Sequence, residues 1–266
     1  MIEQIVLGIV QGVAEWLPIS SEGMIVLVKS FFFPDGADLE SLISGALFLH
    51  LGTFLAALIY FRSEVKEIIL SIFKWKESDA KQRKTVSFLV ISTLISGTLG
   101  LILLELLTGI DEKIGVLGAR ATLVVGLLLL VTGFIQVFKP KASAKEEIDL
   151  SIRDGIVLGF VQGFTVLPGL SRSGLTVSAL LLSKFSEETS LKLSFLMSLP
   201  IVLAGNIVLN FNSISNFEPA RLVGLLFAFA FGYLTIGGLL KLARKINFGW
   251  FVVIFGVLSI IASFVA

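Results

Sequence analysis

Long apolar stretches dominate the chain, and six of them are long enough to cross a lipid bilayer. A transmembrane helix needs about 20 consecutive, mainly apolar residues. The six stretches that reach this length are Leu42–Phe61, Val86–Leu107, Val116–Phe138, Ser190–Phe211, Ala220–Leu240 and Phe248–Val265. The pattern therefore predicts an all-α, polytopic membrane protein with six transmembrane helices.

Two further apolar regions are interrupted halfway across the membrane by Pro, Gly and Ser. Each consists of two segments that are individually too short to span the bilayer. The four segments are Met1–Leu17, Ser20–Phe33, Ile152–Leu167 and Ser173–Lys184. Non-helical backbone at membrane depth is tolerated only where it is buried in protein or lines a cavity. The breaks therefore predict two re-entrant helical hairpins.

The two hairpins share a sequence, which indicates an internal repeat. Ile5–Gly12 and Ile156–Gly163 are identical at seven of eight positions, and they lie about half a chain length apart. We expect a first repeat at 1–138 (hairpin 1–33 and three spans), a linker at 139–151, and a second repeat at 152–266 (hairpin 152–184 and three spans). Three spans is an odd number, so the second repeat has inverted topology, as in many transporters.

Basic residues gather on one predicted face. The segment Arg62–Lys84 holds seven Lys or Arg, Lys139–Arg153 holds four and Lys241–Lys245 holds three, whereas the opposite loops carry only Lys113. By the positive-inside rule the basic face is cytoplasmic. This predicts a plasma-membrane protein whose N- and C-termini are both extracytoplasmic.

Composition narrows the chemistry. The 266 residues are 55% hydrophobic and 15% charged, with a mean hydropathy of +0.96, whereas a soluble domain carries about 25% charged residues. A net charge of +1 argues against a nucleic-acid partner. There is no cysteine and only one histidine, which excludes thiolate nucleophiles and multi-His metal centres. No organic cofactor is expected.

Glu15 is the first candidate for chemistry. It lies one turn after Gln11 in an apolar half-helix, so both side chains project from one face. A charge at the centre of a membrane helix costs about 2.5–3.5 kcal/mol on insertion scales, so such residues usually face a partner or a cavity. The alternative is a carboxylate at a solvated hairpin tip.

Arg172 is the second candidate, and it stands between Ser171 and Ser173 at the start of an apolar half-helix. Unpaired backbone N–H groups, two hydroxyls and a guanidinium at a helix N-terminus suit phosphate. The first hairpin supplies a matching helix start at 20–23, and two such starts would form an anion site. Alternatively, these serines are ordinary helix N-caps.

Two more polar residues lie within predicted spans. His50 is either a catalytic base or a hydrogen-bonding partner for a neighbouring helix, and Asn206 is a candidate cavity residue. The sequence leaves both open.

Two motifs resemble the undecaprenyl-diphosphate phosphatase family of integral-membrane, bacitracin-resistance proteins. They are Gln11-Gly12-x-x-Glu15-Trp16-Leu17-Pro18-Ile19-Ser20-Ser21-x-Gly23 and Pro168-Gly169-x-Ser171-Arg172-Ser173-Gly174-x-Thr176. The resemblance implies removal of the terminal phosphate from a C55 polyprenyl diphosphate near the outer face of the membrane, which recycles the lipid carrier for cell-wall synthesis.

The resemblance also implies residue roles. Glu15, Ser21 and Arg172 match the essential glutamate, the proposed nucleophile and the diphosphate-binding arginine. The matching substrate-binding residues are Gln11, Ser20, Ser171, Ser173 and Thr176. The family usually reads Ser-Ser-Thr-Gly-His where this chain has Ser-Ser-Glu-Gly-Met, so Met24 replaces a histidine and Glu22 replaces a threonine.

The leading hypothesis is therefore phosphoryl transfer, with Glu15 activating Ser21 or water. Glu15 and Glu22, together with phosphate oxygens, could hold Mg²⁺ or Ca²⁺, since both ions prefer oxygen ligands. The expected partners are a polyprenyl diphosphate and membrane lipids, and a homodimer is left open. The rival is a polyprenyl-phosphate flippase without hydrolysis, whereas a channel lacks a polar stripe through the six spans.

Overall fold

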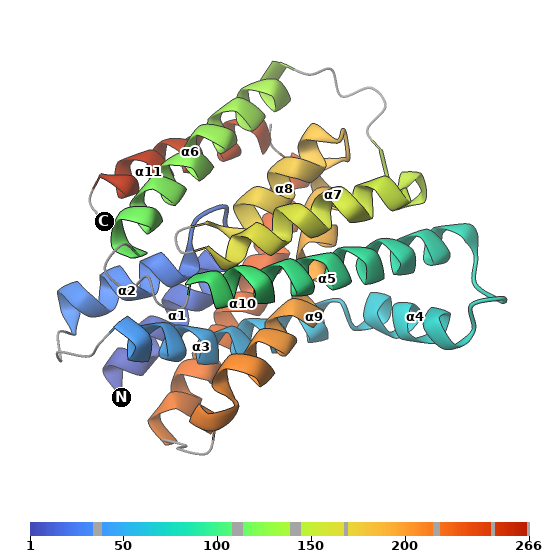
Figure 1. Cartoon of the computed structure of the whole chain (residues 1–266). Helices are drawn as coiled ribbons and strands as arrows, with labels where there is room; N and C mark the ends of the chain where they lie inside the picture. Colours follow the sequence, from blue (N-terminus) through green and yellow to red (C-terminus); the bar gives the residue numbers. More distant parts are fainter. Residues whose placement is uncertain are drawn as a thin grey trace.

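The computed structural model describes residues 1–33, 39–107, 114–138, 145–167, 170–214, 219–245 and 248–264, and these are helical almost throughout (Figure 1). The α-helices are α1 (Ile2–Ala14), α2 (Ser21–Phe32), α3 (Leu39–Tyr60), α4 (Arg62–Phe73), α5 (Ala80–Leu107), α6 (Ile114–Phe138), α7 (Ile152–Gly163), α8 (Arg172–Leu182), α9 (Glu187–Ile214), α10 (Pro219–Lys245) and α11 (Phe248–Ser263). Two short 3₁₀ helices are η2 (Glu147–Asp149) and η3 (Phe164–Val166).

Each of the six predicted spans coincides with a helix, namely α3, α5, α6, α9, α10 and α11. Within the described residues, α5, α9 and α10 are long and apolar enough to cross a membrane, and α3 with α4 makes a fourth if that bent pair is one span. The described residues thus form an all-helical fold with several apolar helices, consistent with a polytopic membrane protein. The number six itself stays a prediction.

Helix α4 was not predicted, because its charges suggested a loop. The chain bends by 81° between α3 and α4. The new helix exposes Ile69, Ile72 and Phe73 beside Lys66. Apolar and basic side chains exposed together are typical of a helix at a membrane surface.

The four half-length segments of the predicted hairpins also form helices, and serine caps explain where three of them begin. Ser20 caps α2 by accepting a hydrogen bond from the N–H of Gly23 at 3.2 Å. Ser171 caps α8 in the same way, through the N–H of Gly174 at 3.1 Å. Ser151 begins α7 with a capping box. The break at 168–169 lies outside the described residues.

Glycines explain why the octet is repeated. Helix α1 packs along α10, and α7 packs along α5. A Cβ on Gly8 would lie 2.2 Å from the carbonyl oxygen of Gly224, and a Cβ on Gly159 would lie 2.8 Å from Cβ of Ile95. Gly12 and Gly163, one turn further on, are equally crowded. Both copies of the octet therefore let a half-helix approach a long helix closely.

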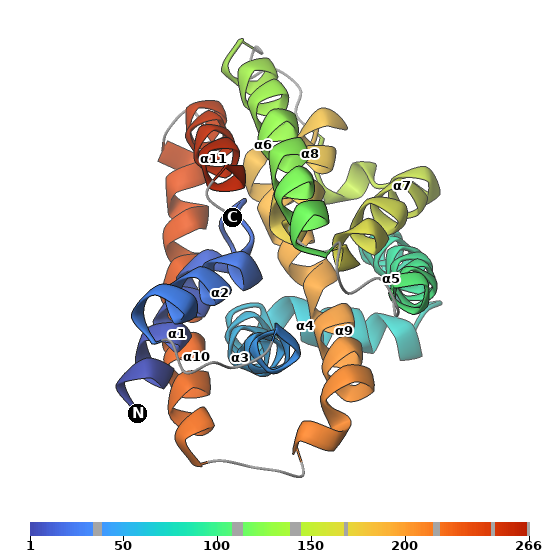
Figure 2. The ribbon, with the colours of Figure 1, turned by 60° about the vertical axis from the view of Figure 1, so that its left-hand side comes forward.

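Aromatic packing and paired glycines fix the remaining helices. Trp16, which follows α1, is almost fully buried and meets Phe195 of α9 edge-on at 4.8 Å between ring centroids. Helices α6 and α11 lie side by side in both views (Figures 1 and 2), and Gly133 and Gly249 sit at this close contact.

An ion-pair cluster joins four segments at the basic end of the molecule. Glu147 of η2 contacts Lys192 of α9 at 2.8 Å and Lys81 of α5 at 2.9 Å, and Lys192 also contacts Glu64 of α4 at 3.4 Å. Burial alone would raise the pKa of the Glu147 carboxyl, but the hydrogen bonds from Lys192 and Lys81 outweigh it and lower that pKa. The cluster thus ties the 3₁₀ turn before α7 to the helices around it.

Candidate active site

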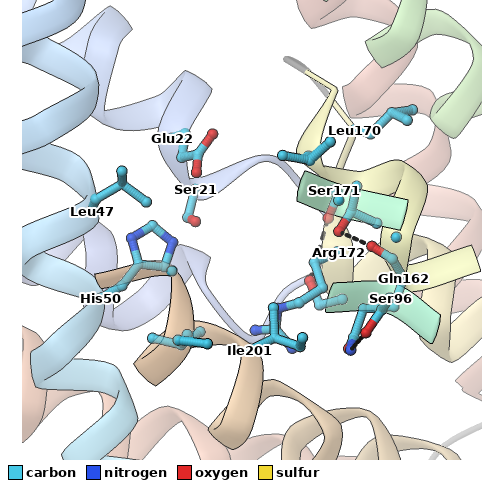
Figure 3. A pocket seen from close by; sticks show the side chains of 18 of the residues that line it. Ser21, Glu22, Leu47, His50, Ser96, Gln162, Leu170, Ser171, Arg172 and Ile201 are labelled. Atoms are coloured by element: carbon cyan, nitrogen blue, oxygen red, sulfur yellow. Dashed lines mark hydrogen bonds between the residues drawn. The ribbon is translucent and has the colours of Figure 1, made fainter. Parts of the chain in front are cut away.

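A cavity of about 260 Å³ opens between residues of the first hairpin and the start of α8, with α3, α5 and α9 completing its wall (Figure 3). One part of the wall is polar and the other is apolar. The polar lining residues are Glu15, Ser20, Ser21, Glu22, His50, Ser96, Gln162, Thr165, Ser171, Arg172, Ser173 and Asn206. Most of the sequence-predicted site residues thus lie around one space, although they come from both halves of the chain.

Glu15 is the centre of this polar wall, and its side chain is 4% exposed. Its Oε2 accepts hydrogen bonds from Gln11 Nε2 at 2.9 Å and from Ser21 Oγ at 2.8 Å. The same oxygen lies 3.1 Å from His50 Nε2, and Oε1 accepts a short hydrogen bond from Arg172 Nη2. Four donors around one buried carboxyl satisfy its ionised form.

Arg172 is the first residue of α8 and links the two halves electrostatically. Besides its ion pair with Glu15, its Nη1 donates to the carbonyl oxygen of Ser194 at 3.3 Å. A guanidinium has five N–H donors, and the contacts within the described residues use two of them. The remaining donors and the start of α8 form a suitable anion site.

Ser171 and Ser173 join the two hairpin loops. Ser171 Oγ donates to the carbonyl oxygen of Ile19 at 2.9 Å, and Ser173 Oγ donates to that of Leu17 at 2.5 Å. Their hydroxyl protons therefore hold the first hairpin against the second. Both side chains still line the cavity, where their oxygens face any ligand.

Gln11 and Thr176 are not among the described residues that line the cavity. The side-chain amide of Gln11 donates a hydrogen bond to Glu15 Oε2. Thr176 Oγ1 lies 2.7 Å from both the carbonyl oxygen of Arg172 and Ser194 Oγ, so it holds the first turn of α8 to α9. In this structure both residues hydrogen-bond to residues that line the cavity, and their role in binding substrate stays a prediction.

The sequence left His50 open, and the structure places it in the site. Its Nδ1 lies 2.8 Å from the carbonyl oxygen of Ala46, and its Nε2 faces Glu15. No signal in the sequence of α3 places His50 opposite Glu15, because that contact depends on how α3 packs. Met24, at the position where the family usually has histidine, is not among the described residues that line the cavity.

Gln162 is a second residue that sequence reasoning missed, although the repeat could have found it, since it is the counterpart of Gln11. Its Nε2 donates to Ser96 Oγ at 3.0 Å, while its buried Oε1 has no hydrogen-bond partner within the described residues.

The arrangement does not favour the predicted cation site. Both oxygens of Glu15 are already used by side-chain donors, and Glu22 lines the cavity without a hydrogen bond or ion pair among the described residues. In the part of the chain that the structure describes, no group of three or more His, Cys, Asp or Glu side chains is placed to hold a metal. Glu15 therefore does not fit as a metal ligand, and the chemistry below uses no cation.

The chain is similar to known proteins over nearly its whole length. The family model for bacitracin resistance protein BacA matches residues 4–261. The undecaprenyl-diphosphatase of Methanococcoides burtonii is 43% identical over 98% of this chain and 98% of its own length. The undecaprenyl-diphosphatase of Haloarcula marismortui is 38% identical, with 97% and 96% covered. Undecaprenyl-diphosphatase 2 of Halalkalibacterium halodurans is 34% identical, with 78% and 73% covered. The chain therefore belongs to the bacitracin resistance protein BacA family.

Proposed function

We propose that this protein hydrolyses a polyprenyl diphosphate, with undecaprenyl diphosphate as the reference substrate, to polyprenyl monophosphate and inorganic phosphate. The observation that carries the proposal is the buried contact of Ser21, Glu15 and Arg172 in one cavity. It joins a hydroxyl, a carboxylate that accepts its proton and a guanidinium beside them. Relatives named undecaprenyl-diphosphatase, matched over nearly the whole chain, support the same reaction.

Arg172 binds the diphosphate in this proposal. Phosphoryl transfer depends mainly on positioning and on neutralising charge on the transferred group. Along one edge of the cavity, Arg172 and the backbone N–H groups that begin α8 supply the donors for the phosphate, whereas the hydroxyl protons of Ser171 and Ser173 already go to backbone carbonyls. A phosphate at this edge would share Arg172 with Glu15.

Glu15 is the general base. Ser21 Oγ already donates its proton to Glu15 Oε2, so the hydroxyl is oriented for deprotonation. A phosphate that draws Arg172 away would remove one donor from the carboxylate and make it a stronger base. A water in the cavity could use the same carboxylate, and the attacking oxygen is therefore either Ser21 Oγ or water.

The apolar part of the cavity suits the prenyl chain. Leu101 and Leu104 of α5 and Ile201 of α9 line it. Gly100 and Gly205 also line it, and a Cβ on either would meet no atom within 4 Å. These two glycines therefore leave space beside the charged end of the site, in contrast to the crowded glycine at position 8. The first isoprene units would lie here.

The setting of the reaction follows from the sequence. We place the protein in the plasma membrane with its termini outside, the site near the outer face, and the product returning to the lipid-carrier pool. The matched packing of α1 on α10 and of α7 on α5 supports the inverted repeat, since these are corresponding helices of the two halves. Whether the protein is a homodimer is open.

Release of inorganic phosphate from C55 diphosphate in liposomes tests the proposal. We expect the wild type to release phosphate and Glu15→Gln to lower the rate by about 10²–10⁴. Arg172→Lys should lower it by about 10²–10³, because an ammonium group cannot bind a phosphate through two parallel hydrogen bonds as a guanidinium can. Arg153→Ala, an exposed arginine on α7, is the matched control and should equal the wild type. Lipid translocation without phosphate release would support the alternative function, a polyprenyl-phosphate flippase. The relatives, which are named undecaprenyl-diphosphatase, do not favour that alternative.

A further inference from the structure

The proposed mechanism gives no role to His50, a titratable residue that lines the cavity. Figure 3 shows its ring directed toward Ser21, with Glu22 on the same side of the cavity. The side chain is about 10% exposed and comes from α3, so it belongs to neither hairpin. Among the described residues, the charged or titratable groups that line the cavity with it are Glu15, Glu22 and Arg172.

The contacts of His50 define where its protons lie. A carbonyl oxygen only accepts hydrogen bonds, so Nδ1, at 2.8 Å from the carbonyl oxygen of Ala46, carries a proton. Nε2 lies 3.1 Å from the Glu15 oxygen that also accepts the Ser21 hydroxyl. An ionised carboxylate also only accepts, so this second contact needs a proton on Nε2. The geometry is that of an imidazolium that can release a proton into the cavity from Nε2.

We propose that His50 is a catalytic residue, the general acid of the reaction, and that its Nε2 protonates the leaving oxygen of the diphosphate. The inference rests on the proposed function. His50 and Arg172 contact the two oxygens of the Glu15 carboxylate, so only this carboxylate would separate a phosphate bound to Arg172 from Nε2. Position 24 holds a methionine, which carries no titratable proton, and α3 supplies the acid instead.

The reaction balances with groups that are present. The attacking oxygen of Ser21 or water gives its proton to Glu15 and bonds to the terminal phosphorus. The bond from that phosphorus to the bridging oxygen breaks, and this oxygen leaves on the polyprenyl monophosphate with the electron pair and the Nε2 proton.

The direct contact between Glu15 and His50 then resets the site. Glu15 holds the proton of the nucleophile, His50 lacks one, and a proton can pass across 3.1 Å from carboxyl to Nε2. If Ser21 is the nucleophile, water attacks the phosphoserine, Glu15 takes a proton of that water, and Ser21 Oγ regains one from Glu15. The net reaction consumes one water.

The test is the pH dependence of kcat for polyprenyl diphosphate hydrolysis by the full-length protein, wild type beside His50→Gln. A glutamine amide can still donate to Glu15, as Gln11 does, but it cannot give up a proton. Thr53→Val is the matched control on α3, because Thr53 Oγ1 donates to the backbone oxygen of His50 at 3.0 Å and not to its ring.

We expect His50→Gln to lower kcat by about 10²–10⁴, with KM within about threefold of the wild type. The decline of kcat on the alkaline side should disappear, since the acid that is lost there in the wild type is absent. Thr53→Val should keep the wild-type profile. An unchanged kcat, or a lower kcat that still declines at alkaline pH, would overturn the inference, because the ring would then be dispensable or would only position Glu15.

His50→Asn, whose shorter amide stays nearer to Ala46, is the second variant if His50→Gln does not fold, and the same outcomes apply to it. The proposed function fails separately: a wild type that binds the lipid but releases no phosphate at any pH refutes hydrolysis itself. An active wild type with an alkaline decline in His50→Gln refutes only the role of His50.

Discussion

Replacing Arg172 by alanine should destabilise the protein as well as inactivate it. The change leaves the Glu15 carboxylate, 4% exposed, with His50 as its remaining cationic neighbour among the described residues. Removing one partner of a buried ion pair costs about 3–5 kcal/mol, because the other charge stays buried without compensation. His50 compensates part of that charge, so we expect the low end, about 3 kcal/mol. At about 2–4 °C per kcal/mol, Tm falls by about 6–12 °C.

A double-mutant cycle isolates the ion pair from the other effects of the substitution. Thermal unfolding in one detergent is followed by tryptophan fluorescence for the wild type, Arg172→Ala, Glu15→Gln and the double variant. Glutamine keeps a carbonyl oxygen for the donors at Gln11 and Ser21, so the double variant should be more stable than the sum of the single losses predicts, by about 1–3 kcal/mol. Arg153→Ala should change Tm by less than about 2 °C. Strict additivity, or a Tm for Arg172→Ala equal to the wild type, would refute the reasoning.

Three further predictions follow from single positions. Gly8→Ala forces a Cβ to 2.2 Å from a backbone oxygen and should lower the free energy of unfolding by about 1–3 kcal/mol, whereas Gly238→Ala, where a Cβ has open space, should not. Equal melting curves for the two variants would contradict this packing. Gly100→Leu should raise KM for C55 diphosphate by about tenfold, which corresponds to about 1.4 kcal/mol of binding free energy. Tm and the activity on a short prenyl diphosphate should be retained, and Gly238→Leu is the control. An unchanged KM would remove the prenyl chain from this part of the cavity. Glu147→Gln should destabilise the protein at neutral pH, and this difference should fade as pH falls below the usual carboxyl pKa of 4.5, because ion pairing with Lys192 lowers the pKa of Glu147 in the folded protein. A difference that does not shrink as pH falls would contradict the ion-pair account.

Some of the site could be predicted from the sequence because its chemistry is costly in a membrane. Glu15 and Arg172 are each expensive to bury alone, so their pairing across the two halves is the outcome that membrane energetics favours. The starts of α2 and α8 could also be predicted from the sequence, because Ser20 and Ser171 are typical N-cap residues that follow a break in an apolar segment.

Other parts depend on packing, which local pattern does not encode. The contact of His50 with Glu15 requires α3 to lie against both hairpin ends. Ser173 was expected to bind phosphate through its hydroxyl, yet its proton goes to the carbonyl of Leu17, because the start of α8 packs against the end of the first half-helix. The bend after α3 and the helix α4 were not predicted, since charges between positions 62 and 84 favoured a loop over a surface helix.

The most direct test of the account is hydrolysis of polyprenyl diphosphate in H₂¹⁸O with mass analysis of both products. Attack on the terminal phosphorus, by water or through Ser21, puts the label into inorganic phosphate and leaves the polyprenyl monophosphate unlabelled. Glu15→Gln should slow this incorporation by about 10²–10⁴. Label in the lipid product, or release that does not depend on Glu15, would contradict the mechanism.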